Sequence, residues 1–331
     1  MGDPAVAIGL KGQKMKIGIV LHPQAGLDAV LEEARNADAQ GYDSVWLGDH
    51  LTLPHAEPRA DFPLDSFVLM TAIGATTTRI RLAWGVINPT FRRPLVTAKM
   101  LASLDHISGG RVICAVGAGS FEGEHHAYDM PWIADRDERV AYAREVLRVW
   151  KHVWTHPAPE VIDFDGDFIQ AKGLTFNPQP VQRPHPPIWV GGESDATLET
   201  VRELGDGWVL LTGGKFERIP EAMNAPGWPD RPMVIVKNVR IHVAPTRDEA
   251  IADARISFDR GGRHMPATFD EFVANGLVGT PEECVASLDR LHSFGITYLR
   301  VEMRDAEHQE RVARMLLPLM EDAMPASASG G

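Results

Sequence analysis

Strand-like and helix-like segments alternate along nearly the whole chain, and this alternation is the feature that most limits its fold. Short runs rich in β-branched and aromatic residues predict eight strands, at 16–21, 44–47, 80–86, 112–116, 187–190, 208–211, 234–242 and 298–302. A segment with helical periodicity follows each of them, and the connection over 212–233 carries the weakest pattern. Apolar strands between amphipathic helices indicate a parallel sheet that helices cover on its faces.

The number of these strand–helix units favours one kind of α/β fold, a single (β/α)₈ TIM-like barrel, over an open doubly wound sheet. The predicted barrel domain spans residues 15–324, after a flexible N-terminal segment, 1–14, and before a disordered tail, 325–331. Helices are expected at 27–40, 66–76, 94–107, 135–154, 195–204, 247–258, 281–294 and 307–324.

A mid-chain insertion, at about 155–186, interrupts the alternation. It contains DFDGDF, a turn signal between two short strand-like pieces, and then the proline-rich NPQPVQRPHPP. We expect a hairpin, followed by a rigid segment that leads into the fifth strand.

Charge and cysteine content limit the partners and the compartment. The net charge is −12 and there is no basic stripe, so neither nucleic acid nor an anionic membrane is an expected partner. No apolar run is long enough to span a bilayer, and Cys114 and Cys284 lie far apart, so we expect a cytoplasmic protein without a disulfide framework. No metal site is expected, because the adjacent His125 and His126 have no third ligand nearby and are typical of a surface or a pocket rim.

Polar and glycine residues recur at the carboxyl ends of successive predicted strands. In a barrel of this kind those ends carry the active site. Taken singly, such a residue is typical of a turn or a helix cap, but their repetition at one end predicts a site there. In strand order they are His22, then Asp49 and His50, then Asn88, then the VGAGS segment with Ala118 and Gly119, then the VGGES segment with Gly191, Gly192, Glu193 and Ser194.

Two backbone features at the same end are open to more than one interpretation. The paired glycines of GGESD would let backbone N–H groups approach an anion, usually a phosphate, at the start of the next helix. The same letters are also typical of a tight turn in which Ser194 or Asp195 caps that helix. Gly85 beside Val86, at the end of the third strand, is a candidate bulge that would aim the backbone out of the barrel.

Several longer segments are together highly specific, and they resemble the luciferase-like flavin-dependent oxidoreductases, the bacterial luciferase superfamily. They include GYDSVWLGDH, VGAGSFEGEHHAYDMP, PHPPIWVGGES with ELGDGW, and VGTPEECVASLDRLHSFGITYLRVE, and the resemblance runs from residue 16 to about 318. It implies a TIM-like barrel, usually a homodimer, that uses reduced FMN or the deazaflavin coenzyme F420 and acts on a small-molecule substrate.

The resemblance also assigns cofactor contacts to the strand ends. In this family a bulge after the third strand, often with a non-prolyl cis peptide, backs the cofactor ring, and by position it corresponds to Gly85 and Val86. The paired glycines after the fifth strand correspond to the loop that holds the cofactor phosphate. The cofactor-binding residues implied in this way are Gly85, Val86, Asn88, Ala118, Gly119, Gly191, Gly192, Glu193 and Ser194.

The catalytic residues that the resemblance implies are His50 and Asp49. His50 would give or take a proton near the ring, since histidine titrates near neutral pH. Asp49 would orient that histidine or bond the ring edge. Glu124 would either brace the loop after the fourth strand or be a solvated charge, and RGGRH at 260–264 would be either a lid or a solvated loop.

The choice of cofactor depends on two positions. Asp-His at 49–50, and Val140 in the long helix, favour F420 and two-electron hydride transfer. The alternatives are a reduced-FMN-dependent monooxygenase that uses O₂ and a separate flavin reductase, and a barrel that binds flavin without turnover. Ser120 stands where the sugar-phosphate dehydrogenases of the family have an acid, so their general acid is not transferred to this chain.

Overall fold

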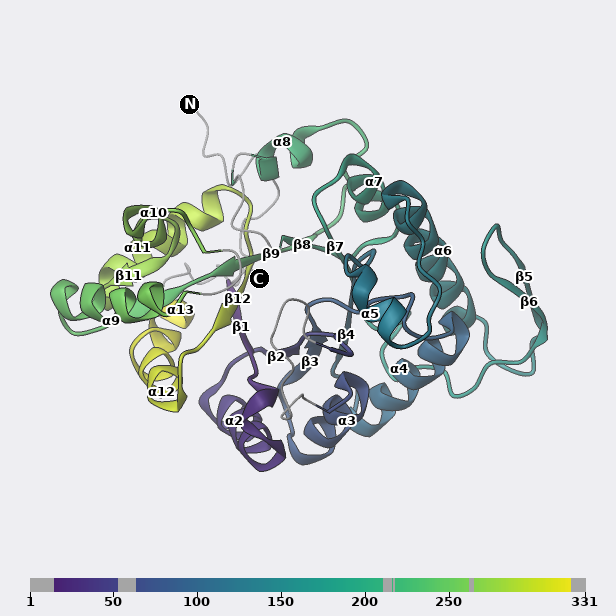
Figure 1. Cartoon of the computed structure of the whole chain (residues 1–331), viewed down its shortest axis with the longest axis horizontal. Helices are drawn as coiled ribbons and strands as arrows, with labels where there is room; N and C mark the ends of the chain where they lie inside the picture. The colour runs from purple at the N-terminus through teal and green to yellow at the C-terminus, as the bar shows by residue number, and fades with distance from the viewer. Residues whose placement is uncertain (1–14, 53–63, 211–215, 217, 262–264, 323–331) are drawn as a thin grey trace, which may run out of the picture. The chain divides into compact units, whose positions relative to one another are not determined.

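The computed structural model describes residues 15–52, 64–210, 216, 218–261 and 265–322. Eight strands close into a parallel barrel in the order β1-β12-β9-β8-β7-β4-β3-β2 (Figure 1). Every one of them coincides with a predicted strand, so the predicted TIM-like barrel is confirmed. The strands are β1 (Lys16–Val20), β2 (Ser44–Leu47), β3 (Arg81–Trp84), β4 (Val112–Val116), β7 (Ile188–Gly191), β8 (Gly207–Leu210), β9 (Val234–Val239) and β12 (Tyr298–Glu302).

Most helices also lie where the periodicity places them, and their ends have identifiable causes. The side chain of Asp65 caps the N-terminus of α3, Asp135 caps α6, and Thr246 with Glu249 forms a capping box on α9. α4 ends at Gly109, which adopts the left-handed conformation. These helices are α2 (Leu27–Gln40), α3 (Ser66–Thr76), α4 (Pro94–Ser108), α6 (Arg136–Thr155), α7 (Asp195–Leu204), α9 (Arg247–Asp259) and α11 (Pro281–Ser293). α8 (Arg218–Asn224) lies in the connection with the weakest pattern, where the sequence analysis places no helix.

Two predicted elements are each divided in the structure. The predicted strand 234–242 corresponds to two strands. The first is β9, which belongs to the barrel, and after Arg240 the chain continues as β10 (Ile241–Val243), which pairs instead with β11 (Leu277–Gly279). The predicted helix 307–324 breaks at Leu316 into α12 (Ala306–Met315) and α13 (Leu317–Asp322). Pro318 explains the break, because it has no N–H to donate to the preceding turn and its ring clashes with that turn.

The mid-chain insertion is a hairpin, as the sequence predicts. β5 (Ile162–Asp165) and β6 (Gln170–Leu174) pair in an antiparallel manner. Glu145 of α6 is buried and accepts N–H groups from three residues of the turn, Asp167, Phe168 and Ile169, at 2.6–2.9 Å. A buried carboxylate with these donors anchors the hairpin to α6.

The contacts of the chain divide it into two compact units, which share the barrel strands between them. The first contains the chain up to Val20, Asn36–Ser44 and the chain from Leu210, and the second contains Leu21–Arg35 and Val45–Val209. Among the described residues, none of the helices is long and apolar enough to cross a membrane. The predicted N-terminal segment 1–14 and tail 325–331 lie outside the described residues.

Candidate functional site

The residues that follow β2, β3, β4 and β7 contact one another within the second unit. Asp49 after β2 accepts the backbone N–H of Asn88 after β3, at 3.0 Å. The ends of β4 and β7 both lie against Val86. The structure therefore brings most of the predicted strand-end residues together.

His50 is held by a buried carboxylate. Its Nδ1 lies 2.9 Å from Oε2 of Glu124, and the same glutamate accepts the backbone N–H groups of Leu51 and Thr52 on Oε1, at 2.9 and 3.1 Å. Burial acts to raise the pKa of Glu124, but hydrogen bonds from His50 and from the backbone lower it below its ordinary value. Glu124 is 2% exposed, so it is not a solvated charge, and the loop it braces follows β2 rather than β4.

The imidazole of His50 remains partly accessible. Its side chain is 27% exposed, and its ring lies 5.3 Å from that of Phe121. Within the part of the chain that the structure describes, no residue bonds its Nε2. The ring thus has one nitrogen fixed by Glu124, and its side chain is partly exposed.

Asp49 is bound on both oxygens by the protein itself. It accepts Ser66 Oγ at 2.7 Å, the N–H of Asn88, and both terminal nitrogens of Arg92 at 2.9–3.1 Å. Arg92 also reaches Asp65 at 2.7 Å. Burial acts to lower the pKa of Arg92, and the carboxylates of Asp49 and Asp65 raise it above its ordinary value. The partner that orients His50 through Nδ1 is therefore Glu124 rather than Asp49, and Asp49 ties β2 to the segment after β3.

The turn after β3 has the backbone that the resemblance implies. The peptide bond between Gly85 and Val86 is cis. A methyl group placed on Gly117 would lie 2.5 Å from Val86 Cγ2, and one on Gly191 would lie 2.8 Å from Val86 Cγ1. Side chains at these two positions would collide with Val86, so the glycines at the ends of β4 and β7 make room for it.

Asn88, which follows β3, contacts the loop that follows β4. Its Oδ1 accepts the hydroxyl of Thr90 at 2.7 Å, and that hydroxyl lies 2.6 Å from Nε2 of His125. A Cβ on Gly119 would lie 2.8 Å from Asn88 Oδ1, and the φ of Gly119 is +76°, so no other residue suits this position. The loop is therefore packed on Asn88.

The prediction for His125 is wrong. His126 is exposed, as expected of a surface or a rim, but His125 is fully buried, between the rings of Phe91 and Trp132. The short helix α5 (Glu122–Ala127), which the sequence analysis does not predict, turns the first of the two histidines inward and leaves the second outside. A single residue step along a helix rotates the side chain by about 100°, which separates the two environments.

The turn after β7 bears out the helix-cap interpretation, and anion binding there stays a prediction. Ser194 caps α7 by accepting the N–H of Thr197 at 3.2 Å, as one interpretation predicts. Gly192 donates its N–H to Val209 at 3.2 Å and accepts the indole N–H of Trp208 at 2.7 Å. The backbone of Gly192 thus serves the barrel, and an anion at this turn would depend on the first N–H groups of α7.

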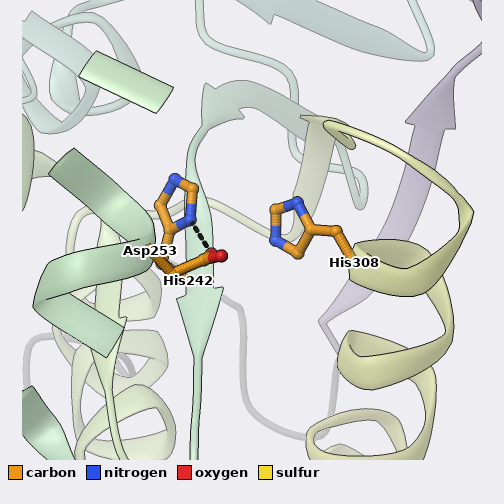
Figure 2. Close-up of side chains that lie close together, drawn as sticks. All are labelled: His242, Asp253 and His308. Carbon is orange, nitrogen blue, oxygen red and sulfur yellow. Dashed lines mark hydrogen bonds and ion pairs between the residues drawn. The ribbon is translucent and has the colours of Figure 1, made fainter. Parts of the chain in front are cut away.

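A second cluster of titratable side chains lies in the first unit. His242 of β10, Asp253 of α9 and His308 of α12 place ligand-type atoms within 4.8 Å of one another (Figure 2). Nδ1 of His242 lies 2.7 Å from Asp253, and Asp253 also pairs with Arg304 and Arg311. The sequence analysis does not predict this cluster, because its members are 66 residues apart at their extremes, 242 to 308, with no motif spacing.

Comparison with known proteins agrees with this geometry. The Luciferase-like monooxygenase family matches residues 15–298. The FMNH(2)-dependent dimethylsulfone monooxygenase of Pseudomonas putida is 27% identical over 297 residues, which cover 80% of each chain. The F420-dependent glucose-6-phosphate dehydrogenase of Mycobacterium avium (strain 104) is 33% identical over 193 residues, which cover 57% of this chain and 54% of that one. Among solved structures, monooxygenase RslO1 from Streptomyces bottropensis superposes with a TM-score of 0.75 at 26% identity, over 92% of this chain and 99% of that one.

Proposed function

Because the chain belongs to the luciferase-like monooxygenase family, it is a flavin- or F420-dependent oxidoreductase, and we propose that its cofactor is F420. The proposed reaction is a two-electron hydride transfer between that cofactor and a small organic substrate that carries a hydroxyl or carbonyl group. The observation that carries the proposal is His50, whose ring is fixed at Nδ1 and partly exposed at the carboxyl end of β2.

The residues at the strand ends fit a bound deazaflavin. Gly85 and Val86 are partly exposed, and the glycines beside them keep side chains off the surface that a planar ring would cover. The N-terminus of α7 suits the phosphate. When bound, F420 supplies the carbon that accepts or releases the hydride.

His50 performs the proton half of the reaction. In the oxidative direction, the imidazole of His50 would take the proton as the substrate O–H bond breaks, and bound F420 would supply the acceptor for the hydride from the C–H bond, so that a C=O bond could form. In the reductive direction, the imidazolium returns the proton to the oxygen. A positioned acid–base group of this kind contributes about 10²–10⁴-fold to such a rate.

F420 is favoured over FMN by three residues at two places in the chain. Asp49 and His50 follow β2, and Val140 is buried in α6. By the resemblance, Asp-His after the second strand and a non-aromatic residue at the position of Val140 are typical of the family members that use the deazaflavin. The relative named for FMNH(2) matches more of the chain, whereas the one named for F420 has the higher identity over a shorter stretch. The competing proposal is a reduced-FMN monooxygenase, which would need O₂ and a separate reductase as a partner. In either case we expect a homodimer.

An anaerobic titration of the purified protein with F420, reduced F420, FMN and reduced FMN tests the proposal. Absorbance and fluorescence report binding of each. Tight binding of F420 with weak binding of FMN is the expected result, and alcohol and ketone substrates would then be screened. A preference for reduced FMN would replace the proposal with the monooxygenase, and binding of none of the four would overturn the enzymatic assignment.

A further inference from the structure

We propose that Glu124 is a positioning residue that fixes the tautomer of His50, so that the proton is exchanged at Nε2 and never at Nδ1. This inference rests on the proposed function for its catalytic consequence, but its structural part concerns only this chain. It follows from which atoms around Glu124 can donate a hydrogen bond and which can only accept one.

The two carboxylate oxygens of Glu124 have different partners. Oε1 receives two backbone donors, the N–H groups of Leu51 and Thr52, at 2.9 and 3.1 Å. Oε2 lies 2.9 Å from Nδ1 of His50. An ionised carboxylate only accepts, so Nδ1 must carry the proton of that bond. In the neutral imidazole the lone pair is then on Nε2.

The surroundings of Glu124 keep it in this role. The side chain is 1% exposed, and the backbone donors are adjacent residues of the loop that begins at His50. A shift of the carboxylate would therefore leave two partly buried donors without their acceptor, which is costly. The same carboxylate thus shapes the loop and selects the nitrogen that the substrate meets.

The Glu124→Gln substitution reverses the tautomer without changing the shape of the side chain. The N–H groups of Leu51 and Thr52 require an acceptor, so the amide oxygen must take the place of Oε1. The amide NH₂ then takes the place of Oε2 and donates to Nδ1. The neutral His50 ring must then carry its proton on Nε2. A protonated Nε2 has no lone pair with which to accept a proton from a substrate hydroxyl.

The test uses the full-length protein labelled with ¹⁵N-histidine. Long-range ¹H–¹⁵N correlation spectra distinguish a protonated from an unprotonated ring nitrogen, and a His50→Asn sample assigns the signals. We expect the wild-type protein above neutral pH to show Nδ1 protonated and Nε2 unprotonated. We expect the Glu124→Gln protein to show the reverse. A wild-type spectrum with Nε2 protonated, or no change in the variant, would overturn the inference.

Glu145→Gln is the matched control, because Glu145 is also buried and also accepts backbone N–H groups, at the hairpin turn, but binds no histidine. It should leave the tautomer of His50 unchanged. Circular dichroism of both variants checks that they fold. If Glu124→Gln does not fold, the wild-type spectrum alone still tests the inference.

The catalytic consequence has its own readout. With F420 and an accepted alcohol, Glu124→Gln should lower kcat by about 10²–10⁴-fold, as a wrong tautomer does in other enzymes, and leave the cofactor Kd within about threefold. A reversed tautomer with kcat unchanged would overturn the assignment of the proton to Nε2. Failure of the protein to bind F420 at all would instead overturn the proposed function, since the spectra need no cofactor.

Discussion

Two histidine–carboxylate pairs in this molecule have nearly the same geometry and opposite surroundings. In the second unit, Nδ1 of His50 lies 2.9 Å from Glu124, and in the first, Nδ1 of His242 lies 2.7 Å from Asp253. The side chain of His50 is 27% exposed, whereas that of His242 is 2% exposed. The bond alone therefore does not distinguish a catalytic histidine from a structural one.

The difference lies in the remaining partners. Asp253 is also paired with Arg304 and Arg311. His308 stacks on His242 with ring centroids 5.1 Å apart, donates Nε2–H to the carbonyl of Ile241, and accepts the N–H of Arg304 on Nδ1. Both nitrogens of His308 are thus in use, whereas no described residue bonds Nε2 of His50. We infer that the first unit uses its pair for stability and the second uses its pair for chemistry.

The largest effect should come from His50. His50→Asn should lower kcat/KM by about 10²–10⁴-fold, because it removes the proton acceptor, and should change the free energy of unfolding by less than about 1 kcal/mol, because the ring is partly exposed. Steady-state kinetics and urea unfolding measure the two quantities. His126→Asn, at an exposed position of α5, is the control and should stay within about twofold of wild type. Equal losses in the two variants would contradict the role of His50.

The opposite result is expected for Asp253. Asp253→Asn removes the carboxylate that pairs with His242, Arg304 and Arg311, and should lower the free energy of unfolding by about 3 kcal/mol. Urea unfolding gives that value, and kcat of the folded variant should stay within about twofold of wild type, since this cluster takes no part in the proposed chemistry. A stable variant with reduced kcat would reverse the roles assigned to the two pairs.

Acid should destabilise the protein through the first unit. Burial, and the nearby His242, lower the pKa of His308 from its ordinary 6.5 to about 4. The unfolded chain therefore binds a proton below pH 6.5 that the folded chain refuses until about pH 4, so stability is full above 6.5 and is lost as the pH falls towards 4. The loss from this residue is about 3 kcal/mol. Burial also lowers the pKa of His242, which adds to the loss in the same direction.

Urea unfolding between pH 7 and pH 4 measures this loss, and His308→Gln is the variant that isolates it. Glutamine can still donate to Ile241 and accept from Arg304, but it does not titrate. Its stability should therefore fall less steeply over this range than that of wild type. Parallel curves for the two proteins would mean that His308 is not the group responsible.

The sequence predicts the barrel strands well because each is a short, continuous apolar run, which is what a strand buried on both faces requires. It fails where an element is short or where a run serves two sheets. The pattern does not show α5 or α10 (Phe269–Asn275), and the run 234–242 hides the change from the barrel to the pairing with β11. The break between α12 and α13 does have a signal in the sequence, which is Pro318.

The site shows the same limit more sharply. The sequence places His50, Asp49 and Asn88 at strand ends, because the carboxyl ends of parallel strands share one edge. It does not say which carboxylate meets which base. Glu124 is 74 residues from His50, and Arg92 is 43 residues from Asp49, so both pairings depend on how neighbouring strands are set in the barrel. Asp49 stands next to His50 in sequence, and adjacency suggests a pairing, but the structure gives the two side chains different partners, Arg92 and Glu124.

The smallest expected effect is that of metal ions on the pair formed by His242 and Asp253. His242, Asp253 and His308 have the residue types of a zinc site, but two arginines already bind Asp253, and a metal on His308 would displace a hydrogen bond. About 100 µM Zn²⁺ should therefore leave the Tm unchanged within about 1 °C, with EDTA-treated protein as the reference. A site with a Kd of about 1 µM would instead add about 2.7 kcal/mol and raise the Tm by several degrees. A rise of that size, lost in His308→Gln, would show that the arginines yield to a metal and that the two pairs differ less than their present partners indicate.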